Sequence, residues 1–505
     1  MKKYISVILI SVMIFCMAGC DEATASIIYA EFENAPSNLD PQTAEDFADL
    51  LIIRNTFEGL TRKDGEGKTV LACAQTYNIS NGGLTYTFTL KDNLKWNDGT
   101  PLTAADFEFA VKRAKAPETK SPFSYMLSDI ASCTASGDNT VVITLSTVDC
   151  DLLDLLSYSV CMPCHKEFFE NSKGKYGLSP DYLLSNGSFY IKKWVITGEF
   201  AMRMLKSKNY TGDFKPKYDA VFFNLSSQED RPQRINKEYL DFGFCDTYTP
   251  SSEYNNVQAL SFADSTLYAL VLNDNKILAL PSARNAVAIS IDRDEIAAQL
   301  PSNYKISNIY LPQCIIEKNQ NVCGNLKQIT APNYQPQNAA NIMLELLKQK
   351  ENKGLSFSGN SIIYMKDENK KTMANAVAKS LQKSISAYVN IEEIAKQSDF
   401  NAKIESKDYD FAIVELDSQD GSIFDHLQKF AKFNLPNFDK SLAALSAAKT
   451  YAEKTKAVTD CINTIKSSNR VLPICSTGHT LLYNKKHKMP KTSYDNGCID
   501  FALVK

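Results

Sequence analysis

The chain has 505 residues, of which 44% are hydrophobic and 22% are charged. This composition is ordinary for a globular protein. The net charge of −3 gives no basic surplus of the kind that nucleic-acid binding requires, so a nucleic-acid partner is not expected. At about 150 residues per domain, the length predicts two or three domains.

The first twenty residues read MKKYISVILISVMIFCMAGC. Two lysines precede an apolar run, Tyr4 to Cys16, that is shorter than the roughly 20 residues needed to span a bilayer. This order is typical of a secretory signal. Its end, Met-Ala-Gly-Cys, resembles a bacterial lipobox, although an ordinary signal with an incidental cysteine is the alternative. We therefore expect a signal peptide at 1–19, a lipid on Cys20, a tether at 20–25, and a protein anchored in the cell membrane and facing away from the cytoplasm.

The most informative segment is Leu84 to Ala114, LTYTFTLKDNLKWNDGTPLTAADFEFAVKRA. Its first seven residues alternate apolar or aromatic side chains with threonine, which predicts a half-buried strand. Asn97-Asp98-Gly99 is a turn signal. Thr103 and Asp106 have the spacing of a capping box and predict the start of a helix.

The run W-x-D-G-x-P-L-T-A-x-D-F in this segment resembles the family 5 extracellular solute-binding proteins, the oligopeptide and dipeptide receptors of bacterial ABC importers. Further segments resemble the same family in the same order, and together they span almost the whole chain after the signal peptide. They are SNLDPQTAEDFADLLIIRNTFEGLTR, NGSFYIKKWVITGEFAMRMLKSKNY, ALPSARNAVAISIDRDEIA, KDYDFAIVELDSQDGSIFDHL and NRVLPICSTGHTLLYNKK. Residues 307–337 follow no pattern of the family.

The resemblance implies a two-lobed α/β fold of the periplasmic-binding-protein type, a Venus flytrap with an extra inserted domain and mixed sheets flanked by helices. Lobe I would be discontinuous and lobe II would follow it, with alternating helical and strand patterns that favour an α/β unit. The expected bounds are 26–60, 185–265 and 470–505 for lobe I, 61–184 for the inserted domain, and 266–469 for lobe II.

The resemblance also implies a site for peptides. In FAIVELDSQDG an apolar strand runs into an acidic loop, and the family's acidic residue that accepts the ligand's N-terminal ammonium matches Asp417. Backbone contacts to the ligand match Ile413, Glu415, Ala44, Glu45 and Asp46. Val414 stands where many peptide receptors have tryptophan, so the resemblance does not predict the shape of the first side-chain pocket. Without the resemblance, Asp417 would be read as a solvated loop charge.

Other motifs give no catalytic or metal site. The four histidines stand apart in sequence, with none of the spacings that hold a metal. Cys161-Met-Pro-Cys164-His165 matches a haem-attachment motif or a redox dithiol. The alternative, which we favour for so short a motif, is two unreactive thiols or a local disulfide. Cys314 and Cys323 lie close enough in sequence to close a small loop, and the pairing of the eleven cysteines beyond Cys16 and Cys20 stays open.

We therefore expect a monomeric binding protein, without cofactor, metal or enzymatic activity, that captures short peptides and delivers them to ABC transporter permease subunits. Two alternatives remain. The same fold would bind a nickel chelate, an oligosaccharide or a signalling peptide, or the chain is a lipid-anchored redox protein that uses Cys161 and Cys164.

Overall fold

The structure is a computed structural model that describes residues 26–32, 34–147, 152–195, 201–225, 228–245, 248, 250–274, 276–318, 320–323, 326–417, 423–448, 450–489 and 498–505. The predicted signal peptide at 1–19, the lipidation site Cys20 and the tether at 20–25 lie outside the described residues. No helix among the described residues is long and apolar enough to cross a membrane.

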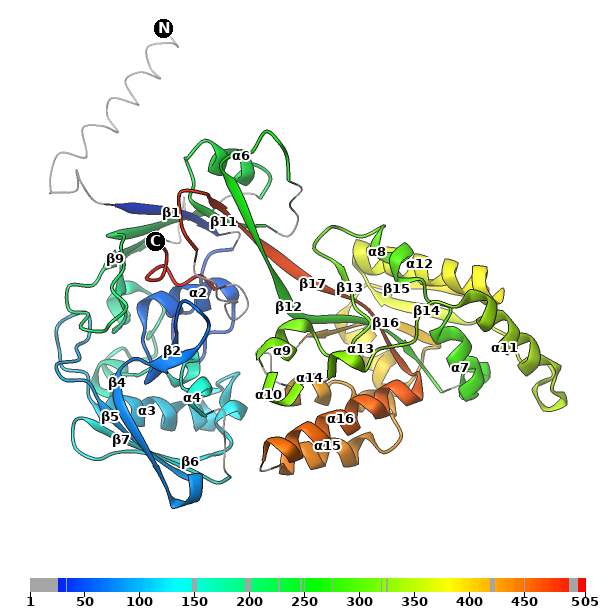
Figure 1. Ribbon diagram of the computed structural model, residues 1–505, viewed down its shortest axis with the longest axis horizontal. Helices are drawn as coiled ribbons and strands as arrows, with labels where there is room; N and C mark the ends of the chain where they lie inside the picture. The colour runs from blue at the N-terminus through cyan, green and yellow to red at the C-terminus, as the bar shows by residue number, and fades with distance from the viewer. Residues whose placement is uncertain are drawn as a thin grey trace, which may run out of the picture.

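An eleven-stranded mixed sheet runs through the whole molecule in the order β15-β14-β16-β12-β17-β11-β1-β10-β9-β8, with β13 paired to β17. Figure 1 shows two bodies at the two ends of this sheet. Two long strands, β12 (Val257–Leu272) and β17 (Val471–Asn484), pair antiparallel along almost their entire length and belong to both bodies. The pairing is irregular between Ala263 and Leu267, where the strands pass from one body to the other.

The first body holds one end of the large sheet and a smaller unit built on separate sheets. Its core is one continuous cluster that reaches from the small sheet through helix α2 to the C-terminal segment at Phe501. The strands of the large sheet here are β1 (Ile27–Phe32), β8 (Phe189–Val195), β9 (Ala201–Lys206), β10 (Ala220–Leu225) and β11 (Phe242–Cys245), with helices α2 (Phe47–Thr56) and α6 (Arg231–Asn236).

The smaller unit falls within residues 61–184. It holds a hairpin of β2 (Thr61–Lys63) and β3 (Thr69–Leu71), and a four-stranded sheet in the order β4-β5-β7-β6. Its elements are β4 (Ala74–Ser80), β5 (Thr85–Leu90), β6 (Ile130–Ala135), β7 (Thr140–Leu145), α3 (Ala104–Lys115), α4 (Leu152–Leu155) and α5 (Lys166–Asn171). The exact bounds of the lobes and of the inserted domain stay a prediction.

The predicted strand, turn and helix of residues 84–114 are confirmed. In β5 the residues Tyr86, Phe88 and Leu90 are buried and the threonines between them are not. Gly99 has a φ of +96°, a value that glycine reaches without strain. The backbone N–H of Thr103 donates to the Asp106 carboxylate at 2.8 Å, which is the reciprocal half of a capping box.

Two motifs that lie far apart in the sequence meet in the core of the first body. Asn186 accepts a hydrogen bond from the Glu58 backbone N–H at 3.0 Å and donates to the Glu58 carbonyl at 2.8 Å. A Cβ on Gly187 would come within 2.5 Å of the Thr56 backbone, so only glycine allows this approach. The Asn-Gly pair thereby fixes the hairpin β8–β9 against the end of α2.

The second body surrounds the other end of the large sheet with helices on both faces. Its strands are β13 (Lys305–Ile306), β14 (Ser361–Met365), β15 (Asn390–Ile394) and β16 (Phe411–Asp417). Its helices are α7 (Pro281–Ala288), α8 (Arg293–Ala297), α9 (Gln313–Lys318), α10 (Gln320–Cys323), α11 (Pro336–Lys348), α12 (Glu368–Ile385), α13 (Gln397–Ser406), α14 (Ile423–Gln428), α15 (Phe438–Ala447) and α16 (Tyr451–Ser468). The predicted alternation of helices and strands is confirmed here.

Residues 307–337, for which the sequence analysis found no pattern of the family, form part of the second body's core. Helix α9 packs against β12 and α10 packs against α16. Tyr310, Ile316 and Cys323 are buried in the hydrophobic cluster that covers one face of the sheet. Cys323 is a free thiol, so the small loop that a Cys314–Cys323 disulfide would close does not form in this structure.

Candidate functional site

Strand β16 carries the predicted anchor from the core of the second body to its rim. Phe411 and Ile413 are fully buried on the face of the sheet that is covered by α7, α11 and α12. Since side chains alternate along a strand, Glu415 and Asp417 continue on that same face. The apolar pattern therefore stops after Ile413, and the two carboxylates follow at the point where the strand leaves its core.

Asp417 is half-buried at the end of β16. It lies opposite Thr266 of β12 in the antiparallel register, and the Thr266 hydroxyl donates to the Asp417 carboxylate at 3.2 Å. This places the carboxylate where β12 passes between the two bodies.

The outer edge of β16 changes character along the strand. Strand β14 pairs with β16 only from Phe411 to Ile413, whereas β12 pairs with it as far as Asp417. Among the described residues, no strand pairs with the second half of β16 on the side away from β12. An edge of this kind leaves backbone N–H and C=O groups ready for an added strand.

The carboxylate of Glu415 forms an ion pair inside the second body. It pairs with Lys370 of α12 at 2.6 Å, and the two side chains are 39% and 14% exposed. Lys370 also lies 5.9 Å above the ring of Tyr268, which contacts the ring of Tyr304 at 5.5 Å. The side chain of Glu415 is thus held by Lys370 in the wall of the second body. Only the backbone N–H and C=O groups of Glu415 are available to a ligand.

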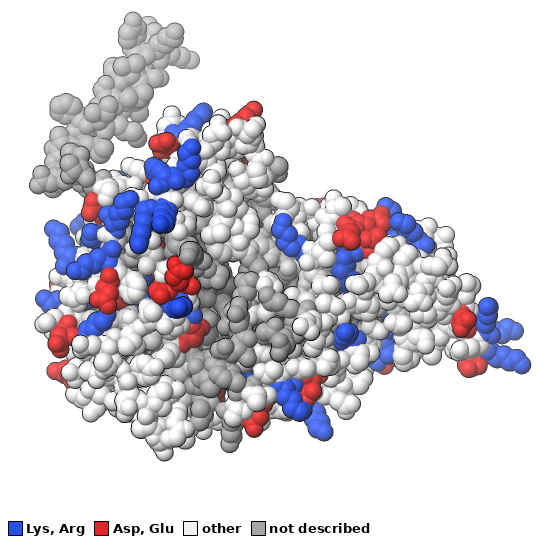
Figure 2. All heavy atoms as spheres, in the orientation of Figure 1, with Lys and Arg blue, Asp and Glu red and all other residues white. Residues whose placement is uncertain are grey.

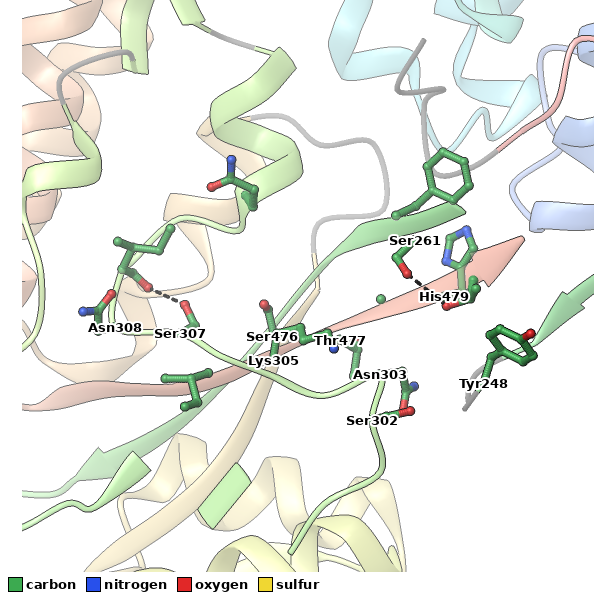
Figure 3. Close-up of a pocket in the computed structure, with 16 residues that line it drawn as sticks. Tyr248, Ser261, Ser302, Asn303, Lys305, Ser307, Asn308, Ser476, Thr477 and His479 are labelled. Atoms are coloured by element: carbon green, nitrogen blue, oxygen red, sulfur yellow. Dashed lines mark hydrogen bonds between the residues drawn. The ribbon is translucent and has the colours of Figure 1, made fainter. Parts of the chain in front are cut away.

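A cavity of about 410 Å³ lies beside this wall, at the crossing of β12 and β17 (Figure 3). Asn303 and Lys305 line the cavity. They flank Tyr304 in the chain, and the Tyr304 ring contacts Tyr268 next to the Lys370–Glu415 pair, so the cavity lies close to that pair. Most of its described lining is hydroxyl or amide, and Lys305 supplies the permanent positive charge. The lining comprises Tyr248, Ser261, Phe262, Ser302, Asn303, Lys305, Ile306, Ser307, Asn308, Ile309, Gln313, Ser476, Thr477, Gly478, His479 and Thr480.

Two hydrogen bonds stiffen the cavity walls, as the dashed lines of Figure 3 show. The hydroxyl groups of Ser261 and Thr480 lie 3.3 Å apart across β12 and β17. On the opposite wall the Ser307 hydroxyl donates to the Ile309 carbonyl at 3.2 Å. The walls therefore come from different segments, and each wall is held by its own contacts.

The predicted positions in the first body precede helix α2. Ala44 is fully buried, whereas Glu45 and Asp46 are exposed and Asp46 is the N-cap residue of the helix. The next residue, Phe47, places its ring 5.6 Å from the His479 ring of the cavity. None of the six predicted site residues is in the described lining of the cavity. The first-body segment reaches it only through Phe47, and Asp417 lies opposite Thr266, whose neighbour Leu267 pairs with the lining residue Ser476.

The sequence interpretation missed Thr266, Tyr304 and the whole cavity lining. One signal was present in the sequence. The run Ser476-Thr477-Gly478-His479-Thr480 interrupts an otherwise apolar strand, and a polar interruption of a buried strand marks a place where that strand meets a ligand or solvent. The positions of Thr266 and Tyr304 depend on strand pairing and on a loop, and the local sequence gives no such signal for them.

The histidines have separate structural environments. His426 is fully buried and burial lowers its pKa to about 4, His165 accepts a hydrogen bond from the Phe168 N–H at the start of α5, and the Nε2 of His487 lies 2.8 Å from Asp241. In the described part of the chain, no group of three His, Cys, Asp or Glu side chains is placed to hold a metal ion.

The thiols of the Cys-x-x-Cys-His motif are inaccessible. Cys161 and Cys164 are 2% and 0% exposed, and both are thiols rather than half of a disulfide. Burial raises the pKa of Cys164 to about 12 and raises that of Cys161 as well. Because the thiolate is the reactive form, this environment argues against the redox alternative and favours two unreactive thiols.

Comparison with known proteins agrees with this arrangement of two bodies. Residues 68–430 match the model of the bacterial extracellular solute-binding proteins, family 5. The match covers well over half of the chain, and the chain therefore belongs to this family, whose members are substrate-binding proteins of transport systems. The two-lobed α/β fold expected from the sequence is confirmed. The first body corresponds to lobe I and the second body to lobe II.

Relatives are similar to part of the chain, and a solved structure has the same fold. The chain is 29% identical over 261 residues to a dipeptide-binding protein of Lactococcus lactis subsp. cremoris, covering 48% of this chain and 47% of the relative. It is 29% identical over 227 residues to the oligopeptide-binding protein OppA of Bacillus subtilis, covering 41% of each. These matches span about half the length of the relatives. The open, unliganded form of the murein tripeptide-binding protein MppA matches with a TM-score of 0.72 at 21% identity, over 95% of this chain and 97% of that one.

Proposed function

We propose that this chain is the extracytoplasmic, lipid-anchored substrate-binding protein of a peptide ABC importer. In this proposal it is a binding protein rather than an enzyme, a monomer that captures oligopeptides between its two lobes and delivers them to permease subunits. Cys20 carries the lipid, and the membrane is a partner through that lipid. The names of the relatives, which are dipeptide- and oligopeptide-binding proteins, support the ligand class.

The observation that carries the proposal is the position of Asp417. A carboxylate at the free end of a strand, next to an unpaired strand edge and a polar cavity, suits a ligand with an ammonium group and an extended backbone. The edge of β16 from Val414 to Asp417 adds the ligand as a strand, which satisfies backbone groups whatever the side chains are. Asp417 would pair with the one cationic group that every free peptide has.

The other predicted contacts follow from this geometry. Ile413 and Glu415 would bind the ligand through their backbone groups, because the Ile413 side chain is buried and that of Glu415 is paired with Lys370. Ala44, Glu45 and Asp46 would contact the ligand from lobe I when the lobes close. Lys305 gives the cavity a cation that suits the carboxylate end of a short peptide.

The first test is mass spectrometry of the compounds released when the purified chain from residue 21 onward is denatured. Mixed short peptides are the expected result. One defined peptide would indicate a signalling ligand, whereas a sugar or a nickel chelate would replace the ligand class and leave the fold in place.

The second test concerns Asp417 directly. Asp417→Asn is expected to weaken binding of free peptides by about 2–5 kcal/mol, because it leaves the ligand's ammonium group buried without its counter-charge. N-acetylated peptides, which lack that charge, should lose far less. The matched control is Asp408→Asn, since the Asp408 side chain is 76% exposed and pairs with Lys403 in the same lobe. Equal losses for free and acetylated peptides would contradict the anchor assignment.

A further inference from the structure

We propose that one face of lobe I binds the anionic phospholipid headgroups of the membrane to which the chain is tethered. The basic face consists of exposed cationic residues on the segments that surround the start of β1: Lys193, Arg203, Lys206, Lys217, Lys486, Lys488 and Lys505. This inference rests on the lipid anchor of the proposed function and adds a second, electrostatic contact with the same membrane.

Hydrogen bonds bring these segments together around the point where the described chain begins. The Ser26 hydroxyl donates to the Lys217 carbonyl at 3.5 Å, and the hydroxyl of the next residue, Tyr218, lies 2.9 Å from His487 Nδ1. The Lys505 N–H donates to the Lys488 carbonyl at 3.0 Å. Three stretches that are distant in sequence, and that each carry exposed lysines, are therefore linked to one another and to Ser26.

The neighbouring strands extend the basic face with aromatic rings. Tyr29 pairs with Phe222, Phe222 with Arg203, and Arg203 with Lys193 in the strand register, so the four side chains share one face of the sheet. The Arg203 guanidinium lies 4.7 Å from the Phe222 ring centroid, and Tyr29 is 42% exposed. Tyrosine beside arginine and lysine is the composition found at membrane–water interfaces.

Lys and Arg side chains are more crowded on this part of the molecule than elsewhere on the face in view in Figure 2. Figure 2 shows Lys and Arg side chains gathering on the body that carries β1 and β9. The acidic groups bonded to the same segments are Asp219, which Ser26 holds, the buried Asp241, which pairs with Lys486 at 2.7 Å, and the carboxyl terminus. Because the whole chain has a net charge of −3, attraction to an anionic surface must come from a concentrated patch of this kind.

The position of the patch matches the predicted tether. Five residues lie between Cys20 and Ser26, and the six steps from one Cα to the other span at most about 20 Å. A lipid on Cys20 would therefore hold the start of β1 close to the headgroups. Polybasic segments next to a lipid anchor add about 1 kcal/mol of membrane affinity for each Lys or Arg near the surface.

The experiment is vesicle flotation with the chain from residue 21 onward, which retains every described residue and has no lipid. It should float with vesicles of phosphatidylglycerol and phosphatidylcholine, and not with phosphatidylcholine alone. Binding should fall as salt is raised, because the Debye length shrinks from about 10 Å at 0.1 M to about 3 Å at 1 M. Absence of binding to the anionic vesicles, or equal binding to both kinds, would overturn the inference.

Two triple variants locate the contact. The triple variant Lys193→Gln, Lys217→Gln, Lys488→Gln should weaken vesicle partitioning by on the order of a hundredfold, or about fivefold for each charge removed. The matched control is Lys348→Gln, Lys350→Gln, Lys353→Gln. It removes the same charge from exposed lysines at the last residue of α11 and just after it, at the opposite end of the long axis in Figure 1, and should keep most of the binding.

Equal losses in the two triple variants would overturn the assignment, because binding would then follow net charge alone. A lobe I variant that floats like the parent chain but fails to deliver peptide in a reconstituted importer would assign the face to the permease instead, and would also overturn it. Peptide release on denaturation is a separate measurement, so failure of the vesicle test leaves the peptide ligand untouched.

Discussion

The buried imidazole of His426 makes lobe II sensitive to acid. Its side chain is fully buried on α14, and its Nε2 donates to the Tyr310 carbonyl at 3.1 Å. Burial, with a smaller contribution from Lys429, lowers the pKa of His426 from 6.5 to about 4. In the unfolded chain the imidazole would regain its ordinary pKa of about 6.5.

The sign of the effect follows from this depressed pKa. The unfolded chain takes up the proton first as the pH falls, so the free energy of unfolding is at its full value above about pH 6.5 and decreases between about pH 6.5 and pH 4. With 1.36 kcal/mol for each pKa unit, the loss is about 2 kcal/mol at pH 5 and about 3 kcal/mol once both states are protonated. That is a large share of a typical stability of roughly 5–15 kcal/mol.

Urea unfolding at about pH 7.5 and about pH 5, followed by circular dichroism, measures this loss. The comparison is with His426→Phe, which keeps an aromatic ring beside Phe430 (ring centroids 5.5 Å apart in the parent) and cannot titrate. The variant should be less stable than the parent at neutral pH, because the Tyr310 carbonyl loses its donor, but its stability should depend less on pH. A variant with the same pH dependence as the parent would refute the reasoning.

Three further predictions follow from packing and charge. Phe501→Ala should lower the free energy of unfolding by about 3–5 kcal/mol, since the ring is fully buried and the cavity is not refilled; a loss below about 1 kcal/mol in urea unfolding would show that the C-terminal segment is not part of the core. The thiol of Cys164 should react with Ellman's reagent only after unfolding, because a pKa of about 12 leaves roughly one part in ten thousand as thiolate at pH 8, and rapid labelling of the folded chain would revive the redox alternative. Glu415→Gln should change peptide affinity by less than about twofold and stability by less than about 1 kcal/mol, because the side chain is partly exposed and paired with Lys370; a large loss of affinity in calorimetry would mean that its carboxylate contacts the ligand.

Features that local sequence determines could be predicted. The alternation in β5, the capping box of Thr103 and Asp106, and the rim strand that ends at Asp417 all depend on neighbours within a few residues. The fold itself was predicted from the order of such local features, which resembles that of a known family along nearly the whole chain.

Features that arise from long-range pairing could not be predicted. Thr266 contacts Asp417 across 151 positions in the chain, and the cavity is built from a loop and two strands that meet only in the folded protein. The Cys-x-x-Cys-His motif misleads for the same reason, because the burial of Cys161 and Cys164 depends on packing that the motif does not encode.

The two long strands β12 and β17 also determine how this protein can be divided. Both strands pair within each of the two lobes. A single cut in the chain therefore cannot divide the protein into two fragments that each contain one complete lobe. A fragment that ends before β17 would leave β11 without the strand that separates it from β12, and a fragment that begins after β12 would lack the inner neighbour of β16. Reporter fusions or split versions of this protein therefore need complementary pieces that reassemble, whereas insertions at an exposed loop tip leave both strands intact.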